Sequence, residues 1–180
     1  MTTSVNPIAI RSKKWICDAF LELLQEKPYN NITITEICDK ADLVRKTFYR
    51  HFNSKESVLV AVIDSMFEDF YNYIQTQNFG PDQMPLAYFT YWEKHKNFLS
   101  ILIENQQFSL LNDQFVIYLE AMAHIVGSKR AYQSELEKEY MRTMLAGGLW
   151  SILKKWMTRD CSESPEEMAR MTLNFFDIKK

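Results

Sequence analysis

The chain has few of the residues that interrupt helices. Its 180 residues include only four glycines and five prolines, so few positions suit the tight turns between strands. No segment shows the strict alternation of a half-buried strand, and no internal repeat or low-complexity tract is present. Hydrophobic residues make up 47% and charged residues 24%, a balance typical of globular proteins. The sequence predicts an all-α fold.

Cysteine is also scarce. Cys17, Cys38 and Cys161 are odd in number, far apart and without a CxxC pair, which argues against a disulfide framework or a zinc site of familiar spacing. We expect thiols kept reduced in the cytoplasm. The N-terminus lacks the pattern of a signal peptide, and the apolar runs are too short to span a bilayer. The expectation is a soluble cytoplasmic protein without a membrane partner, metal or cofactor.

Motifs of catalysis are missing as well. The sequence contains no HExxH, no glycine-rich phosphate loop, and no Ser/His/Asp or Cys/His set at the spacing of a known family. His95 and His124 lie near apolar segments, where they suit either a pocket or ordinary packing. We therefore expect the protein not to be an enzyme.

Charge is unevenly distributed along the chain. Residues 1–55 carry nine Lys or Arg against six Asp or Glu (9 − 6 = +3), whereas residues 56–180 carry twelve against seventeen (12 − 17 = −5), giving −2 overall. Between residues 43 and 55 there are four basic residues and no acidic one. A basic stripe on a mildly acidic body suits a protein that meets phosphates with one face.

Hydrophobic spacing predicts three helices in the first 55 residues. They are expected over Ile8–Glu26, Ile34 to about Ala41, and Arg45–His51. Thr33 and Glu36 form the pattern of a capping box at the start of the second helix. Two short helices joined by a tight turn and packed under a third make a helix-turn-helix, which lays its second helix in the major groove of DNA.

The remaining residues, 56–180, predict a larger helical domain. After a cap at Asn53 or Ser54 a long helix is buried along most of its length and ends near Gly80-Pro81. Further helices are expected over residues 84–94, 98–106, 115–126 and 134–158, and a last one starts at Ser164-Pro165. We place the domain boundary between residues 55 and 56.

The N-terminal segment resembles the TetR family of transcriptional regulators. The resemblance is carried by Ile32-Thr-Ile-Thr-Glu-Ile37 and by the block Thr-Phe-Tyr-Arg-His-Phe-x-Ser-Lys-Glu over residues 47–56. It covers about the first third of the chain; beyond it only the helical layout agrees. It implies a DNA-binding domain followed by a ligand-binding and dimerisation domain.

The resemblance also implies roles for individual residues. Phe48 and Phe52, one turn apart, would anchor the recognition helix, while Arg45 and Lys46 at its start would read bases, since Arg and Lys donate to guanine. Residues at phosphate-contacting positions are Thr33, Thr35, Thr47, Tyr49 and Lys55. Arg50 and His51 complete the outward faces of this helix and are included in the expected DNA-binding set.

Three positions depart from the family pattern. Asp42 stands where the turn usually has glycine, at a position that often needs positive φ. Val44 stands where Ser or Asn usually caps the recognition helix, which removes a cap contributing ~1 kcal/mol. Lys46 replaces a small residue. These departures leave the fold unchanged and the operator sequence unpredictable.

Two further sites are expected in the body of the chain. Aromatic and methionine residues at helical spacing suit either simple core or a ligand cavity, for which the candidates are Phe67, Trp92, His95, Tyr118 and Met122. Gly147-Gly148 in a long helix permits close approach of another helix, or packing within one chain. The expected dimer contacts are Leu145, Gly148, Leu149, Ile152, Trp156, Met171 and Phe175.

The expected function follows from the resemblance. A homodimer would bind a palindromic operator in double-stranded DNA and repress transcription until a small-molecule inducer moves the paired domains apart. The alternative is a TetR-like co-regulator controlled by a partner protein instead of its own ligand. The inducer, the regulated genes and the choice between repression and activation are left open.

Overall fold

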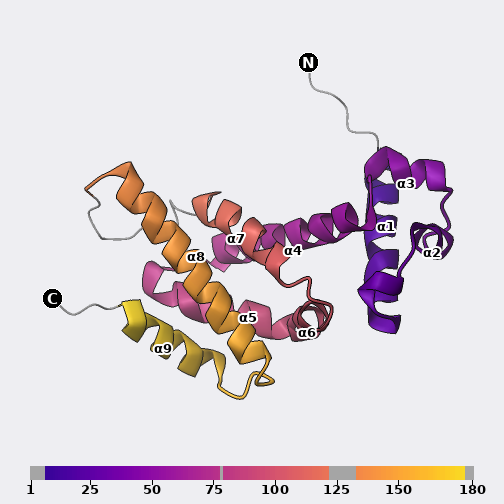
Figure 1. Ribbon diagram of the computed structural model, residues 1–180. Coiled ribbons are helices and arrows are strands. Elements are labelled where there is room, and N and C mark those ends of the chain that lie inside the picture. The colour runs from indigo at the N-terminus through magenta and orange to yellow at the C-terminus, as the bar shows by residue number, and fades with distance from the viewer. Residues whose placement is uncertain (1–6, 78, 122–132, 177–180) are drawn as a thin grey trace. The chain divides into compact units, whose positions relative to one another are not determined.

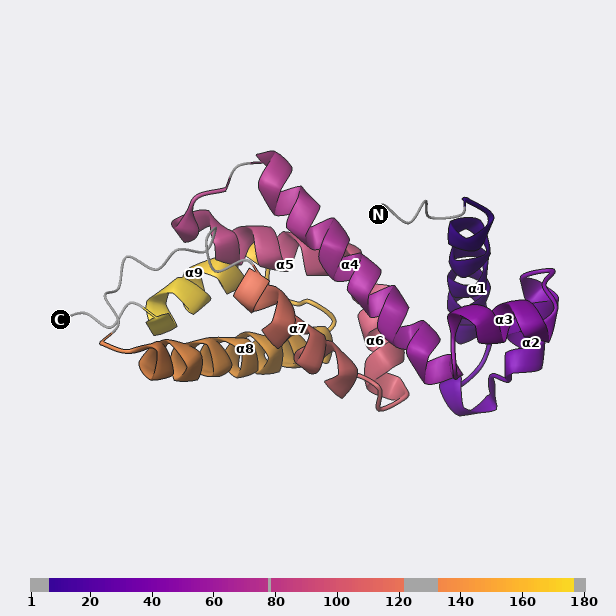
Figure 2. The same ribbon diagram turned by 90° about the horizontal axis from the view of Figure 1, so that it is seen from above.

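The computed structural model describes residues 7–77, 79–121 and 133–176. Figure 1 and Figure 2 show the helices of the chain, and the described residues contain no strand. In chain order the elements are α1 (Pro7–Glu26), η1 (Tyr29–Asn31), α2 (Ile34–Lys40), α3 (Arg45–His51), α4 (Lys55–Gln77), η2 (Pro81–Gln83), α5 (Met84–Lys94), α6 (Lys96–Glu104), α7 (Ser109–Ala121), α8 (Glu135–Met157) and α9 (Pro165–Phe176). The all-α prediction is confirmed.

The chain divides into two compact units, Met1–Ser65 and Met66–Lys180. The division lies inside α4 and not at the start of this helix, where the sequence placed the boundary. The reason is that Val58, Leu59 and Val62 are buried in the part of α4 that belongs to the N-terminal unit. The first turns of α4 therefore complete the N-terminal unit.

The N-terminal unit is built from α1, α2 and α3, which contact one another pairwise. Ile16 and Phe20 of α1, Ile37 of α2 and Phe48 of α3 are fully buried. Burial of such side chains contributes about 1.5–3 kcal/mol each. The two short helices are thus held mainly by their packing on α1, because seven-residue helices are not stable alone.

Caps define where these helices begin. The predicted capping box is present: the Glu36 N–H donates to Thr33 Oγ1 at 3.3 Å, and the Thr33 N–H donates to Glu36 Oε2 at 3.0 Å. Ser54 caps α4, since its Oγ accepts from the Ser57 N–H at 3.3 Å. Val44 gives α3 no side-chain cap, as expected from its side chain.

The turn between α2 and α3 depends on Asp42. Its φ is 53°, in the left-handed region that the sequence anticipated. The next residue, Leu43, donates its N–H to the carbonyl of Cys38 at 2.9 Å, which closes the C-terminus of α2 in a Schellman arrangement.

In the C-terminal unit, α5 packs on α9, and α8 packs on α7 and α6. Trp156 of α8 is buried and meets Phe89 of α5 edge to face, with ring centroids 5.3 Å apart. The predicted start of α9 is confirmed, because Ser164 and Glu167 exchange hydrogen bonds of 3.0 and 3.2 Å as a capping box. None of the described helices combines the length and hydrophobicity needed to span a bilayer.

Two helix predictions need correction. The helix expected over residues 98–106 is α6, which ends earlier because Gln106 takes a φ of 58°. The helix expected from Phe115 is α7, which begins at Ser109, because Leu111 continues the buried face of Phe115 one turn earlier. The predicted residues 122–126 of this helix lie outside the described residues.

Replacing Asp42 by glycine tests the turn. Because glycine adopts positive φ without strain, Asp42→Gly should stabilise the chain by ~0.5–1 kcal/mol, whereas Asp42→Val should destabilise it by ~1–2 kcal/mol. Asp39→Gly, the same change inside α2, should instead destabilise by roughly 0.3 kcal/mol. Urea unfolding measures all three. Equal destabilisation by both glycine variants would show that the turn does not require the left-handed conformation.

Candidate functional site

Helix α3 has one buried face and several exposed side chains. Phe48 and Phe52 are buried, and their ring centroids lie 5.9 Å apart, so the predicted anchoring of this helix is confirmed. The outward side chains are Arg45, Lys46, Tyr49 and Arg50, which are exposed, and Thr47, which is half-buried. Three positive charges and no negative one therefore lie on the exposed surface of α3.

Arg45 and Tyr49 form a pair on this surface. The Arg45 guanidinium donates to the Tyr49 hydroxyl at 3.2 Å, and its central carbon lies 5.8 Å from the centre of the tyrosine ring. The spacing of four residues brings the side chains together on one face of the helix. The pair restricts a long side chain before any partner binds, which lowers the entropy lost on binding.

His51 does not belong with these exposed residues. It is half-buried, and its Nε2 lies within hydrogen-bond distance, 3.2 Å, of Ser12 Oγ on α1. Burial, together with Arg50 and Lys13, holds the pKa of His51 below its ordinary 6.5. His51 thus joins α3 to α1, and its predicted DNA contact stays a prediction.

Thr33 is also occupied within the protein. Its hydroxyl donates to Glu36 Oε2 at 2.9 Å, and its N–H donates to the same oxygen. Both donors bond within the free chain, and the expected phosphate contact of Thr33 stays a prediction. Thr35 is exposed and keeps its predicted role.

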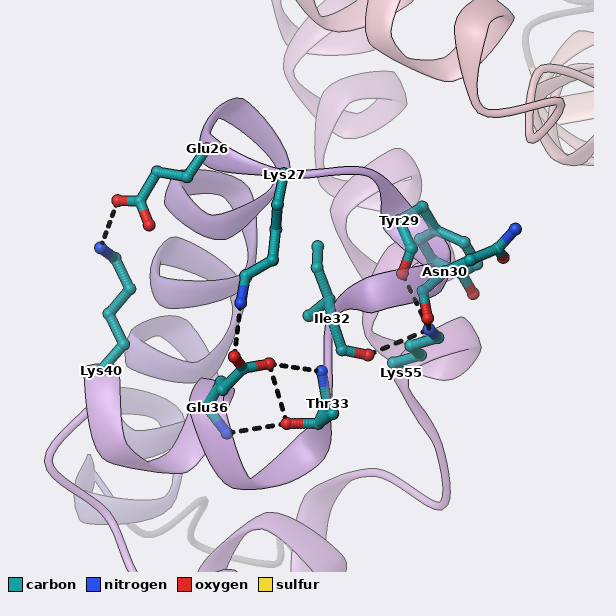
Figure 3. A network of polar contacts seen from close by, with 9 residues as sticks. All are labelled: Glu26, Lys27, Tyr29, Asn30, Ile32, Thr33, Glu36, Lys40 and Lys55. Atoms are coloured by element: carbon teal, nitrogen blue, oxygen red, sulfur yellow. Dashed lines mark hydrogen bonds and ion pairs between the residues drawn. The ribbon is translucent and has the colours of Figure 1, made fainter.

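Glu36 belongs to a wider polar network around α2, shown in Figure 3. It accepts from Lys27, and this contact together with those from Thr33 lowers its pKa to about 2. Lys40 donates to Glu26 at 2.8 Å. Three acidic side chains around α2, those of Glu22, Glu26 and Glu36, are therefore paired with lysines.

Lys55 provides the largest departure from expectation. Its ammonium donates to the backbone carbonyls of Tyr29 at 2.8 Å, Asn30 at 3.2 Å and Ile32 at 3.0 Å (Figure 3). An ammonium has three N–H donors, and all three are used here. In the free chain these donors bond within the protein, and the phosphate contact that the resemblance implied stays a prediction.

Tyr29 adds to the same junction and was not singled out by sequence reasoning. It is buried, its hydroxyl donates to Glu56 Oε1 at 2.9 Å, and its ring lies 4.5 Å from the Lys55 ammonium. Burial, followed by the Glu56 contact, raises the pKa of this hydroxyl. The signal available in the sequence was the Tyr29-Asn30 turn after Pro28, which looked like a helix break alone.

In the C-terminal unit, aromatic side chains from α4, α5 and α7 form one cluster. Phe67 stacks on Tyr118 with ring centroids 5.0 Å apart and meets Trp92 edge to face at 5.4 Å. Tyr88 lies 5.6 Å from Phe115. Three of the predicted ligand residues, Phe67, Trp92 and Tyr118, are thus brought together.

Two polar atoms in this aromatic cluster have no hydrogen-bond partner among the described residues. They are the Tyr88 hydroxyl and the Trp92 Nε1, both buried. An unpaired buried donor costs about 1–3 kcal/mol. His95 is partly exposed and its ring lies 6.4 Å from that of Trp92, at the edge of the cluster. Met122 lies outside the described residues.

Helix α8 exposes an apolar ridge. Leu136, Tyr140 and Met144, spaced four residues apart, are 60%, 69% and 52% exposed. Gly148 and Ile152 continue the same spacing. A Cβ added at Gly147 or Gly148 would meet nothing within 4 Å, so the chain's own packing does not require glycine there.

The expected dimer residues divide into two groups. One group is accessible to a second copy of the chain. Phe175 is 65% exposed, and the partly exposed members are Leu145, Gly148, Leu149, Ile152 and Met171. Trp156 is buried, and its Nε1 donates to the Glu163 carbonyl at 2.9 Å. Its assignment to an interface is wrong, because it is part of the packing within one chain.

Known families match both parts of the sequence. Residues 16–62 match the family described as bacterial regulatory proteins, tetR family. Residues 80–177, more than half of the chain, match a transcriptional regulator C-terminal region of the TetR type. The chain belongs to the TetR family. The end of the first match at residue 62 agrees with a DNA-binding unit that includes the first turns of α4.

Individual relatives are more distant. The uncharacterized regulator YxbF of Bacillus subtilis is 25% identical over 95% of this chain, which spans 46% of that relative's length. The dhaKLM operon activator DhaS of Lactococcus lactis is 31% identical over 36% of this chain and 34% of its own length. The chain thus spans less than half of these curated relatives.

Solved structures confirm the fold. A dihydroxyacetone kinase operon activator DhaS has a TM-score of 0.61 at 23% identity, covering 91% of this chain and 93% of its own. A TetR regulator from Rhodococcus sp. RHA1 has a TM-score of 0.66 at 14% identity, covering 94% and 98%. FadR of Bacillus halodurans, a fatty acid degradation regulator, reaches 0.61 at 18%, covering 93% of both chains.

The TetR assignment settles the general activity. The chain is a DNA-binding transcriptional regulator with a helix-turn-helix, and it is not an enzyme. Among the described residues, no three His, Cys, Asp or Glu side chains are grouped so as to hold a metal ion. The three cysteines are free thiols, with Cys38 buried and the other two partly exposed.

Proposed function

We propose that this TetR regulator is a cytoplasmic homodimer that represses transcription from a palindromic operator and is released by a small aromatic ligand. The observation that carries the DNA-binding part is the division of α3 between its buried anchors, Phe48 and Phe52, and its exposed basic side chains. This arrangement lets a short helix enter the major groove without unfolding its own core.

Within the operator, Arg45 and Lys46 read bases near the start of α3. The Arg45 fork is suited to the two acceptors of guanine, and its contact with Tyr49 prepares it for that geometry. Thr35, Thr47 and Tyr49 position the helix on phosphates, and Arg50 adds charge. Thr33, His51 and Lys55 are left out of the direct contacts because their polar atoms are engaged within the protein.

The homodimer is supported by α8 and α9. A helix-turn-helix monomer reads few base pairs, so two copies related by a two-fold axis are favoured. The exposed ridge of Leu136, Tyr140 and Met144 and the open space at Gly148 suit packing against a helix of a second copy. Phe175 of α9 offers further apolar surface.

The ligand site is proposed in the aromatic cluster. A ligand with an apolar or aromatic body and one hydrogen-bond acceptor would satisfy the Trp92 N–H or the Tyr88 hydroxyl that otherwise lacks a partner. Repacking of Phe67 on α4 around the ligand would tilt this helix, and a tilt of a long helix displaces its far end. Ligand and operator would then oppose each other equally in both directions.

The operator is identified by selecting bound fragments from the source genome. On the selected site, Arg45→Ala should weaken binding by roughly 1–3 kcal/mol and relax the preference at one base pair of each half-site. The matched control is Arg159→Ala, which removes an arginine paired with Glu163 in the C-terminal unit and should leave binding unchanged. Unaltered binding and base preference in Arg45→Ala would refute base reading by α3.

Sedimentation at micromolar concentration tests the dimer. Wild type should sediment as a dimer and Gly148→Leu as a monomer with normal helix content, because the added side chain has room within its own chain. Gly148→Ala keeps the residue small and should remain dimeric. Either a monomeric wild type or a dimeric Gly148→Leu that still binds the operator would overturn the assignment of this face.

A thermal-shift screen of small aromatic acids and ketones tests the ligand site. A binding compound should raise Tm, because binding to the native state alone stabilises it. Trp92→Phe keeps a ring but removes the N–H and should weaken binding about tenfold, while Trp150→Phe, whose ring stacks on Phe108, should not. A wild type that no compound stabilises, but that a partner protein releases from DNA, would favour the co-regulator alternative.

A further inference from the structure

Lys55 lies at the point where α4 meets the turn before α2. It is the first residue of α4, and its ammonium bonds to the carbonyls of Tyr29, Asn30 and Ile32 at 2.8, 3.2 and 3.0 Å. We refer to this set of bonds as the Lys55 anchor. All three carbonyls belong to one turn, η1 with its C-cap Ile32, so the anchor joins the start of α4 to a single short segment.

The Lys55 anchor fixes the entry of α2. Ile32, whose carbonyl it holds, is buried and immediately precedes Thr33, the N-cap of α2. Helix α2 in turn contacts α3. A displacement of the turn would therefore move the helix on which the recognition helix rests.

Neighbouring contacts make the junction difficult to open. The Tyr29 hydroxyl donates to Glu56, the residue after Lys55, and the Tyr29 ring packs edge to face on Phe20 of α1 with centroids 6.3 Å apart. The start of α4 is thereby joined to α1 as well as to the turn. Hydrogen bonds to an ionised group are stronger than those between neutral groups.

A DNA phosphate would have to compete with this whole set. To reach a phosphate, the ammonium would exchange three charge-assisted bonds for contacts with one anion, and the carbonyls of Asn30 and Ile32 would lose this donor, while that of Tyr29 would keep the Ile32 N–H. Lys46, in contrast, is exposed on α3. Lys46 and Lys55 therefore have different surroundings in the DNA-binding unit.

We propose that Lys55 is a positioning residue for operator recognition: its ammonium sets the place of α2 and α3 through the Tyr29–Ile32 turn and does not contact phosphate. The proposal rests on operator binding as proposed above. It separates two properties that a phosphate contact would change together, namely the affinity for the operator and its dependence on salt.

The test compares Lys55→Met with Lys46→Met, which is the same chemical change. A phosphate contact contributes about 0.9 to the slope of log affinity against log salt for each bound copy, on any DNA sequence. If Lys46 lies against phosphate, Lys46→Met should lower the magnitude of this slope by about 0.9 for each bound copy. If Lys46 reads a base, Lys46→Met should instead reduce the preference for that base pair. Lys55→Met should keep the wild-type slope and its affinity for random-sequence DNA, while operator affinity falls about tenfold.

Two outcomes would overturn the proposal. In the first, Lys55→Met lowers the slope and weakens binding to operator and random DNA alike, as a phosphate contact would. In the second, Lys55→Met leaves operator affinity unchanged, and the anchor has no part in recognition. A loss of stability alone changes neither the slope nor the ratio of operator to random-DNA affinity while the protein stays folded.

Acetylation of lysines in the wild-type protein avoids any effect of a substitution on folding. Measured by mass spectrometry, the acetylation of Lys55 should be slow with and without operator, because its three donors are already bonded. The acetylation of Lys46 should be rapid in the free protein and slow in the operator complex. Rapid labelling of Lys55 in the free protein that the operator suppresses would contradict the proposal. If wild type bound no operator at all, the proposed function would fail first, which is a distinguishable result.

Discussion

Three hydrogen bonds from the Lys55 ammonium join the start of α4 to the turn before α2. The turn over residues 29–32 joins α1 to α2 and has no regular structure apart from η1, and its Tyr29 carbonyl also accepts from the Ile32 N–H. Lys55 satisfies these carbonyls and at the same time starts α4. The positions of α2 and α3 therefore depend on their connections to α1 and α4 as well as on the packing of Phe48 and Ile37.

This arrangement divides the charged and polar residues into two groups. One group is used within the protein: Lys55 at the turn, Lys27 and Thr33 at Glu36, and His51 at Ser12. The other group remains on the surface of α3. A chain with a net charge of −2 can bind a polyanion because basic side chains gather on the exposed surface of α3, while Glu26 and Glu36 near α2 are paired with lysines.

Sequence reasoning predicted the fold well because local signals agree with one another. The Thr33–Glu36 capping box, the positive φ of Asp42 and the Ser164 cap are each determined within a few residues, and each is present. The sites were harder to predict. A motif gives the position of Lys55 but not the direction of its side chain, which depends on carbonyls about 25 residues earlier. Trp156 was misassigned for the same reason, since only the packed structure shows that Phe89 covers it.

The role of Lys55 is tested most directly by the position of its ammonium in a crystal structure of the operator complex. We expect Nζ to remain within about 3.2 Å of the carbonyls of Tyr29, Asn30 and Ile32, with α3 in the major groove and no phosphate in hydrogen-bond contact with Lys55. A side chain turned out to a phosphate, with the turn carbonyls left to water, would contradict it.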